Sequence, residues 1–132
     1  MDIFFNDPDE IPLPPEEVRI RKLTAEPWPG DKLIHVYIEV DPFQKRPNAD
    51  LFIRNESGEI AASASIIESM HRKIELTMHL PDSSPGEGYT LDAKLYFAEI
   101  IEGNDSNQET KPINKQVVDR SEIQFRIPIN DT

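Results

Sequence analysis

The clearest pattern in the sequence is a strict alternation of apolar and polar residues over positions 88–97. The apolar positions are Tyr89, Leu91, Ala93, Leu95 and Phe97. A period of two places successive side chains on opposite faces of a strand, so the pattern predicts a half-buried β-strand. Leu91 should then lie in the core and Tyr96 on the solvent face. Replacing Tyr96 with alanine is therefore expected to cost much less stability than replacing Leu91.

Six further segments alternate in the same way, and turn-forming residues separate them. They predict strands at 18–25, 32–40, 49–54, 59–67, 73–80 and 117–129. Asn55-Glu-Ser-Gly58 predicts a tight hairpin, because these residue types form turns. The small residues of 59–67 indicate an edge strand or a close backbone approach. Residues 102–116 are polar and predict a long loop, and a bulge is expected at Asp119 and Arg120.

The first 17 residues have a different composition from the rest of the chain. They contain six acidic residues, no basic residue and four prolines, a composition that resists both helix and central strand. We expect an extended, acidic, proline-rich arm over 1–17 and a single domain over 18–132. The apolar cluster of Ile3, Phe4 and Phe5 in this arm should dock against protein surface, in the same chain or in a second copy.

Trp28 lies between two prolines that restrict its backbone. Tryptophan is highly buried on average, which favours a plug that closes one open end of the fold. The alternative is an exposed aromatic anchor for a partner, because tryptophan is enriched in binding hot spots.

Seven short strands with turns about every ten residues predict an all-β protein of two packed sheets, with a small barrel as the alternative. The run Gly88-Tyr89-Thr-Leu91-Asp-Ala93 resembles the start of strand F in immunoglobulin-like and fibronectin type III-like modules, where the tyrosine makes a corner hydrogen bond. This resemblance implies a seven-stranded antiparallel immunoglobulin-like β-sandwich over 18–129. The chain lacks the two cysteines and the strand-C tryptophan of true immunoglobulin domains. The resemblance therefore implies a fold and names no function.

Charge and composition narrow the choice of partners. The formal net charge is −11, with 25 acidic residues against 14 Lys and Arg, which disfavours nucleic acid as a partner. The absence of cysteine excludes disulfides and thiolate chemistry. The sequence shows no apolar run long enough to span a membrane and no secretory signal. We therefore expect a cytoplasmic protein that binds neither nucleic acid nor membrane.

The motifs of common enzyme active sites are absent from the sequence. No serine lies in a nucleophile elbow, and the five glycines form no phosphate-binding loop. We expect no enzymatic activity and no cofactor. His35 and His79 are expected on the outer face of neighbouring strands, where they could form half of a zinc site and Glu39 or Glu75 could add a third ligand. A solvated sheet face is the simpler interpretation of the same residues.

The connections between strands two and three, four and five, and six and seven should meet at one end of an immunoglobulin-like sandwich. They would bring together a small basic and apolar surface, formed by Phe43, Lys45, Arg46, Met70, His71, Arg72 and Lys73. Positive charge concentrated on an acidic protein favours an acidic protein partner, or the acidic arm itself. We therefore predict a protein-binding or scaffold domain, which the arm could also join into a homo-oligomer.

The competing prediction is a ligand-binding module for carbohydrate or metal. It would use the exposed sheet face around His35, Tyr37 and His79. An exposed row of aromatic rings would favour carbohydrate, and the alternation leaves only Tyr37 and Tyr96 for this purpose.

Overall fold

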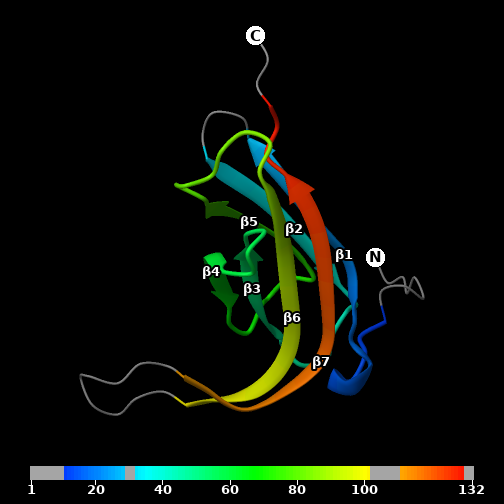
Figure 1. Cartoon of the computed structure of the whole chain (residues 1–132). Coiled ribbons are helices and arrows are strands. Elements are labelled where there is room, and N and C mark those ends of the chain that lie inside the picture. Colours follow the sequence, from blue (N-terminus) through cyan, green and yellow to red (C-terminus); the bar gives the residue numbers. More distant parts are fainter. Residues whose placement is uncertain (1–10, 29–31, 102–110, 130–132) are drawn as a thin grey trace.

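The computed structural model describes residues 11–28, 32–101 and 111–129. Within these residues, seven strands form two antiparallel sheets that pack face to face (Figure 1). The strands are β1 (Ile20–Trp28), β2 (Leu33–Val40), β3 (Asn48–Arg54), β4 (Ile60–Ile66), β5 (Lys73–His79), β6 (Gly88–Ile101) and β7 (Lys111–Arg126). A single turn of 3-10 helix, Pro15–Glu17, precedes β1. The described part of the chain has no helix that is both long and apolar enough to cross a membrane.

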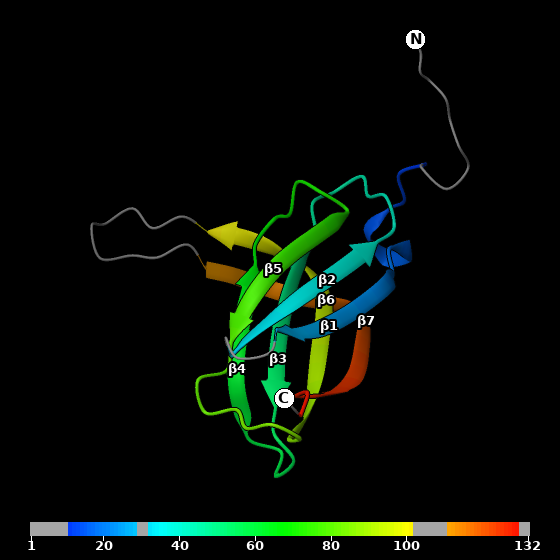
Figure 2. The ribbon, with the colours of Figure 1, turned by 90° about the horizontal axis from the view of Figure 1, so that it is seen from above.

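The two sheets have the strand orders β1-β2-β5 and β4-β3-β6-β7. The alternating pattern predicts two packed sheets, and the family resemblance implies an antiparallel immunoglobulin-like β-sandwich; both are confirmed. Figure 2 shows the first sheet lying across the second. The fourth strand pairs with the third, whereas constant-type immunoglobulin domains place it beside the fifth. β4 therefore forms the edge of its sheet, in agreement with its small residues.

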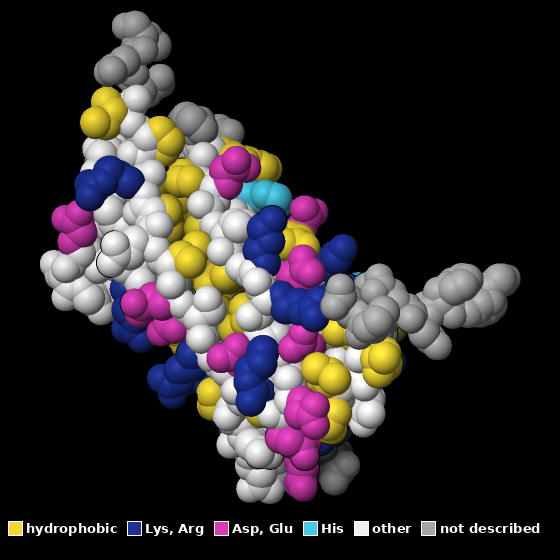
Figure 3. Space-filling model, turned by 90° about the vertical axis from the view of Figure 1, so that its right-hand side faces the viewer, with side chains coloured by type: hydrophobic (Ala, Val, Ile, Leu, Met, Phe, Trp, Pro, Cys, Tyr) yellow, Lys and Arg dark blue, Asp and Glu magenta, His cyan; other side chains and the backbone are white. Residues whose placement is uncertain are grey.

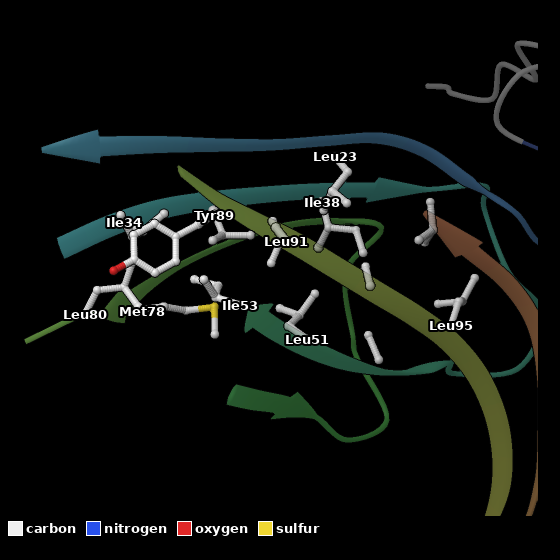
Figure 4. Packing of buried hydrophobic residues seen from close by; sticks show 14 of the residues in the cluster. Leu23, Ile34, Ile38, Leu51, Ile53, Met78, Leu80, Tyr89, Leu91 and Leu95 are labelled. Atoms are coloured by element: carbon white, nitrogen blue, oxygen red, sulfur yellow. The ribbon is translucent and has the colours of Figure 1, made fainter. Parts of the chain in front are cut away.

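Alternate residues of both sheets form one apolar core (Figure 4). The side chains that are almost completely buried include Ile34, Val36, Ile38, Leu51, Ile53, Leu91 and Leu95. Leu91, in the centre of the alternating run at 88–97, has no exposed surface. The prediction that this residue faces the core is confirmed.

The side of the sandwich between β1 and β7 is closed by apolar side chains that remain partly exposed. Figure 3 shows a strip of hydrophobic side chains between charged residues on this side. The partly buried hydrophobic residues of β1, β7 and the segment after β7 that pack against the core include Ile20, Ala25, Ile123, Phe125 and Ile127. A hydrogen bond also joins the two sheets here, because the Ile20 amide donates to Oδ2 of Asp119 over 2.9 Å. The Asp119 side chain thus provides the acceptor for the Ile20 amide, which lies on the free edge of β1.

The outward position expected for Tyr96 is wrong, because its side chain is only 1% exposed. β6 pairs Leu95 with Asp119 but Tyr96 with Val117, so that one extra residue of β7 bulges between them. Beyond this bulge the two strands bend together (Figure 1), and Lys115 Nζ lies 4.7 Å from the centre of the Tyr96 ring. The bulge lies at Val118, just before the expected site at Asp119 and Arg120.

The long loop expected at 102–116 is also shorter than its polar sequence suggests. Residues 111–116 belong to β7, and Lys111 pairs with Ile101 of β6. Hairpin pairing to β6 satisfies the backbone groups of this polar segment, which overrides its loop-like composition.

Tyr89 occupies the end of the core beside Ile34, Met78 and Leu80 (Figure 4). Its ring stacks on Phe125 with 5.8 Å between ring centres. The hydroxyl donates to Oε1 of Glu87 over 2.8 Å. The acceptor is thus a side-chain carboxylate, whereas the family resemblance implies a backbone acceptor for the tyrosine corner.

Tyr89 should make the folded state sensitive to alkali. Burial raises the pKa of Tyr89 to about 12, and the hydrogen bond to Glu87 acts in the same direction. The unfolded-state pKa is about 10, so the stability linked to the neutral phenol is complete below about pH 10 and is lost as pH rises from about 10 to about 12. We expect Tyr89→Phe to reduce the loss of stability between about pH 9 and about pH 11.5, as measured by urea unfolding. If Tyr89→Phe loses as much stability as the wild type over this pH range, ionisation of Tyr89 is not the cause of the alkali sensitivity.

Candidate functional site

The connections at one end of the sandwich are joined into a single structure. Strands β2 and β4 end there, and β3 and β5 begin there (Figure 2). The amide of Ser69, in the β4–β5 connection, donates to the carbonyl of Pro47, in the β2–β3 connection, over 2.9 Å. The expected adjacency of these two loops is therefore present in the structure.

A buried asparagine fixes the β4–β5 connection. Asn48 is 1% exposed, accepts a hydrogen bond from the Glu68 amide at 2.8 Å and donates to the Tyr96 carbonyl at 3.3 Å. The Ser69 hydroxyl bonds both the carbonyl and the amide of His71, at 2.7 and 3.2 Å. Glu68 has a φ of 47°, a strained left-handed conformation that this network holds in place.

The fixed loop displays an apolar side chain. Met70 is 68% exposed and Ile67 is 41% exposed. Lys45, Arg46 and His71 are also exposed. We call the surface formed by these five residues the loop platform. Sequence reasoning missed Ile67, because its position at the end of an apolar run suggested no role beyond the strand.

Two other cations expected on this surface, Arg72 and Lys73, lie close to Glu39 of β2. Arg72 donates from Nε to the Val40 carbonyl over 3.3 Å, and its Nη2 lies 3.5 Å from Oε2 of Glu39. Lys73 sits opposite Glu39 in the β2–β5 pairing. Arg72 therefore secures the junction of loop and sheet, and Lys73 lies on the outer sheet face near the same carboxylate.

Glu39 is the centre of this small polar cluster. The hydroxyl of Tyr37 donates to its Oε1 over 2.8 Å. This hydrogen bond holds the pKa of Glu39 below its ordinary value, and Lys73 and Arg72 act in the same direction. The same hydrogen bond raises the pKa of Tyr37. The hydrogen bond thus favours a neutral phenol on Tyr37 and a charged carboxylate on Glu39 around neutral pH.

Phe43 is partly covered by the N-terminal arm. Leu13 lies parallel to it in an isolated bridge, with hydrogen bonds from the Leu13 amide to the Pro42 carbonyl (2.9 Å) and from the Gln44 amide to the Leu13 carbonyl (3.0 Å). Both Leu13 and Phe43 pack against the core. The end of the arm therefore docks on the β2–β3 connection. The cluster of Ile3, Phe4 and Phe5 lies outside the described residues.

His35 and His79 lie on the outer face of the β1-β2-β5 sheet but are not opposite each other. His35 pairs with Thr77, and His79 pairs with Leu33. Nε2 of His35 lies 4.0 Å from Oε1 of Glu75. Within the described residues, no group of three or more His, Asp or Glu side chains is placed to hold a metal ion.

The plug expected at Trp28 is wrong, because this side chain is 42% exposed. It is the last residue of β1, where Pro27 faces the interior and Trp28 faces out. The indole stacks on the His35 ring, with 5.7 Å between ring centres and 27° between ring planes. Alternation along the strand thus places this tryptophan on the outer sheet face.

A cleft of about 460 Å³ opens at the other end of the four-stranded sheet. Arg54, Glu56, Glu122 and Arg126 line it. Glu56 accepts a hydrogen bond from the Gly88 amide at 3.1 Å and lies 3.9 Å from Arg126. Glu56 and Arg126 are therefore paired with each other, and no histidine is among the described lining residues of the cleft.

No protein-family model matches the sequence. No curated protein sequence matches it either. Solved structures, in contrast, match the fold. A β-glucuronidase of Bifidobacterium dentium in complex with coumarin-3-O-glucuronide has a TM-score of 0.52 at 15% identity, over 83% of this chain and 18% of the enzyme chain.

Two further structures are similar at the same level. A glycosyl hydrolase family 2 member from Bacteroides cellulosilyticus has a TM-score of 0.51 at 13% identity, over 83% of this chain and 15% of that chain. A β-D-glucuronidase of Dictyoglomus thermophilum has a TM-score of 0.50 at 13% identity, over 84% and 16%. The chain therefore shares its β-sandwich fold with a small part of these much longer enzyme chains.

Proposed function

We propose that this protein is a non-enzymatic interaction domain that binds an acidic protein surface through the loop platform. The observation that carries the proposal is the exposure of Met70 on a loop fixed by the hydrogen bonds of Asn48, Ser69 and Pro47. The backbone of a preordered loop loses little further entropy on binding. Methionine also adapts its shape to a partner, because its side chain is unbranched and polarizable.

Charge supports the choice of an acidic partner. The whole chain carries a net charge of −11, whereas Lys45 and Arg46 lie next to each other and exposed on the platform. The rest of this acidic protein repels an acidic partner, whereas a local positive region attracts it. The platform therefore directs an acidic partner to its own end of the sandwich. Elsewhere, on the side shown in Figure 3, basic and acidic side chains are interleaved.

The size of the domain is consistent with a non-catalytic role. The chain spans only about a sixth of the length of the enzyme chains whose fold it shares. The chemical groups of the platform are cations, an imidazole and apolar side chains, which suit contact with a protein surface.

Reversing both exposed cations of the platform tests the proposal. A partner is first captured from native lysate by cross-linking to the wild-type protein, and its binding kinetics are then measured by surface plasmon resonance. We expect Lys45→Glu combined with Arg46→Glu to slow association by roughly tenfold at low salt, with a smaller effect on dissociation. The melting temperature should stay nearly unchanged, because both side chains are exposed.

The matched control is Lys94→Glu combined with Arg120→Glu, which makes the same change in net charge on the outer face of β6 and β7. It should slow association much less than the platform reversal. Met70→Asp should weaken binding through faster dissociation, because it removes the apolar contact. If both double reversals slow association equally, the steering comes from net charge alone and the platform is not the binding surface.

A further inference from the structure

A second surface lies on the outer face of the β1-β2-β5 sheet, at the end away from the loop platform. Trp28 ends β1 there and rests on His35, with 5.7 Å between the ring centres. The tilt between the two ring planes is only 27°, so the indole lies nearly flat on the imidazole. Trp28 is 42% exposed in this arrangement. The sheet thus presents a supported, flat aromatic surface to solvent.

The aromatic surface continues along β2. Tyr37 follows His35 by two residues on the same face, about 7 Å further along the strand. Its ring lies under Lys22, whose Nζ is 5.7 Å from the ring centre, and its hydroxyl bonds Glu39. Both contacts restrict the ring, so Trp28, His35 and Tyr37 form an ordered row of rings.

Hydrogen-bonding side chains border this row on both sides. Glu26 of β1 and Thr77 of β5 lie opposite His35, and Glu75 lies opposite Tyr37. His79 lies on the far side of Leu33 from Trp28. All four bordering side chains are exposed. Each can accept a hydrogen bond, and the threonine and histidine can also donate one.

We infer that this row is a binding site for the pyranose rings of a neutral oligosaccharide. One face of a pyranose carries C–H groups that match the electron-rich face of an aromatic ring, whereas its edge carries hydroxyls. A flat indole bordered by carboxylates, a hydroxyl and an imidazole meets both requirements. The core of a protein interface, in contrast, is depleted of charged residues, whereas Glu26, Glu75 and Lys22 lie directly beside these rings.

The charges of the site select an uncharged sugar. Beside the rings, Glu26 and Glu75 outnumber Lys22, whereas Glu39 is balanced by Arg72. The whole chain is also acidic. Both features repel a uronic acid or a sulfated sugar. The inference is independent of the loop platform, because the two surfaces share no residue.

Trp28 is the only tryptophan of the chain, so its fluorescence reports this site alone. We expect hexamers of β-1,4-linked glucose, xylose or mannose, at concentrations up to about 10 mM, to shift its emission and to protect it from acrylamide quenching. At least one neutral hexamer should do so, and hexagalacturonic acid should bind at least about tenfold more weakly.

Variants then test the placement by calorimetry, which does not depend on the indole. Trp28→Ala should weaken binding of the active hexamer by about tenfold or more, and Trp28→Phe by less, because a flat ring remains. Lys45→Glu combined with Arg46→Glu should leave it unchanged. Circular dichroism checks that Trp28→Ala is folded, and its partner binding through the platform should persist. The inference is overturned if none of the three hexamers perturbs Trp28, if Trp28→Ala binds as the wild type does, or if the acidic hexamer binds best.

Discussion

Replacing Tyr96 with alanine should lower the free energy of unfolding by about 3 to 5 kcal/mol, as much as replacing a core residue. The side chain is 1% exposed, and Lys115 covers one face of its ring at 4.7 Å. Burial also raises the pKa of Tyr96, with Asp50 acting in the same direction. Removing the ring leaves a cavity beneath the bent β6–β7 hairpin. Leu91→Ala, in the centre of the core, should cost about 2 to 5 kcal/mol.

Equilibrium urea unfolding at neutral pH measures both changes. Tyr96→Phe keeps the ring and removes only its hydroxyl, so it should cost about 1 kcal/mol. Thr90→Ala changes a half-buried residue on the same face of β6 and should also cost about 1 kcal/mol or less. A Tyr96→Ala variant within about 1 kcal/mol of the wild type would show that solvent reaches the ring in solution.

Local alternation was enough to place Leu91, because side chains of a strand point to opposite faces whatever the neighbouring strands do. It was not enough for Tyr96. An outward residue is buried only if another element covers it, and here the covering element is the first part of β7. That segment reads as a polar loop, and its bulge at Val118 and its pairing with β6 appear only in the folded sheet. Lys115 then reaches both the Tyr96 ring and Asp50.

Trp28 is the reverse case, because it was expected to be buried and is exposed. The average burial of tryptophan favoured a plug, but an average says nothing about the face of a strand that a residue occupies. Extending β1 to Trp28 puts the residue in register with Leu33 and on the outer face. The alternation from Leu23 indicates this once the strand is continued past Ala25, where the prolines that follow suggested its end. Proline is tolerated here because β1 is an edge strand.

The meeting of the β2–β3 and β4–β5 connections followed from topology alone, since antiparallel hairpins return to the same end. The roles of single cations did not follow. Arg72 contacts Glu39 and the Val40 carbonyl because β2 and β5 pair in one particular register. Sequence alone does not specify that register. Lys45 and Arg46 lie in a loop without such a partner strand, and their exposure agrees with the loop prediction.

Asn48 links the stability of the sandwich to the shape of the loop platform, and Asn48→Ala should affect both. The variant leaves the Glu68 amide and the Tyr96 carbonyl without their side-chain partner at a position that is 1% exposed. We expect a loss of about 2 to 4 kcal/mol in the free energy of unfolding, because each buried group left unpaired costs about 1 to 3 kcal/mol. Urea unfolding measures this loss.

The same substitution should release the loop that carries Met70. The Glu68 amide should exchange its hydrogen much faster in Asn48→Ala than in the wild type, under conditions where both proteins remain folded. Asn48→Asp separates the two contacts of the side chain, because a carboxylate still accepts from Glu68 but cannot donate to the Tyr96 carbonyl. Its Glu68 amide should therefore stay protected. If exchange at Glu68 is unchanged in Asn48→Ala, the bond between Ser69 and Pro47 is sufficient to fix the loop, and Asn48 contributes only to packing.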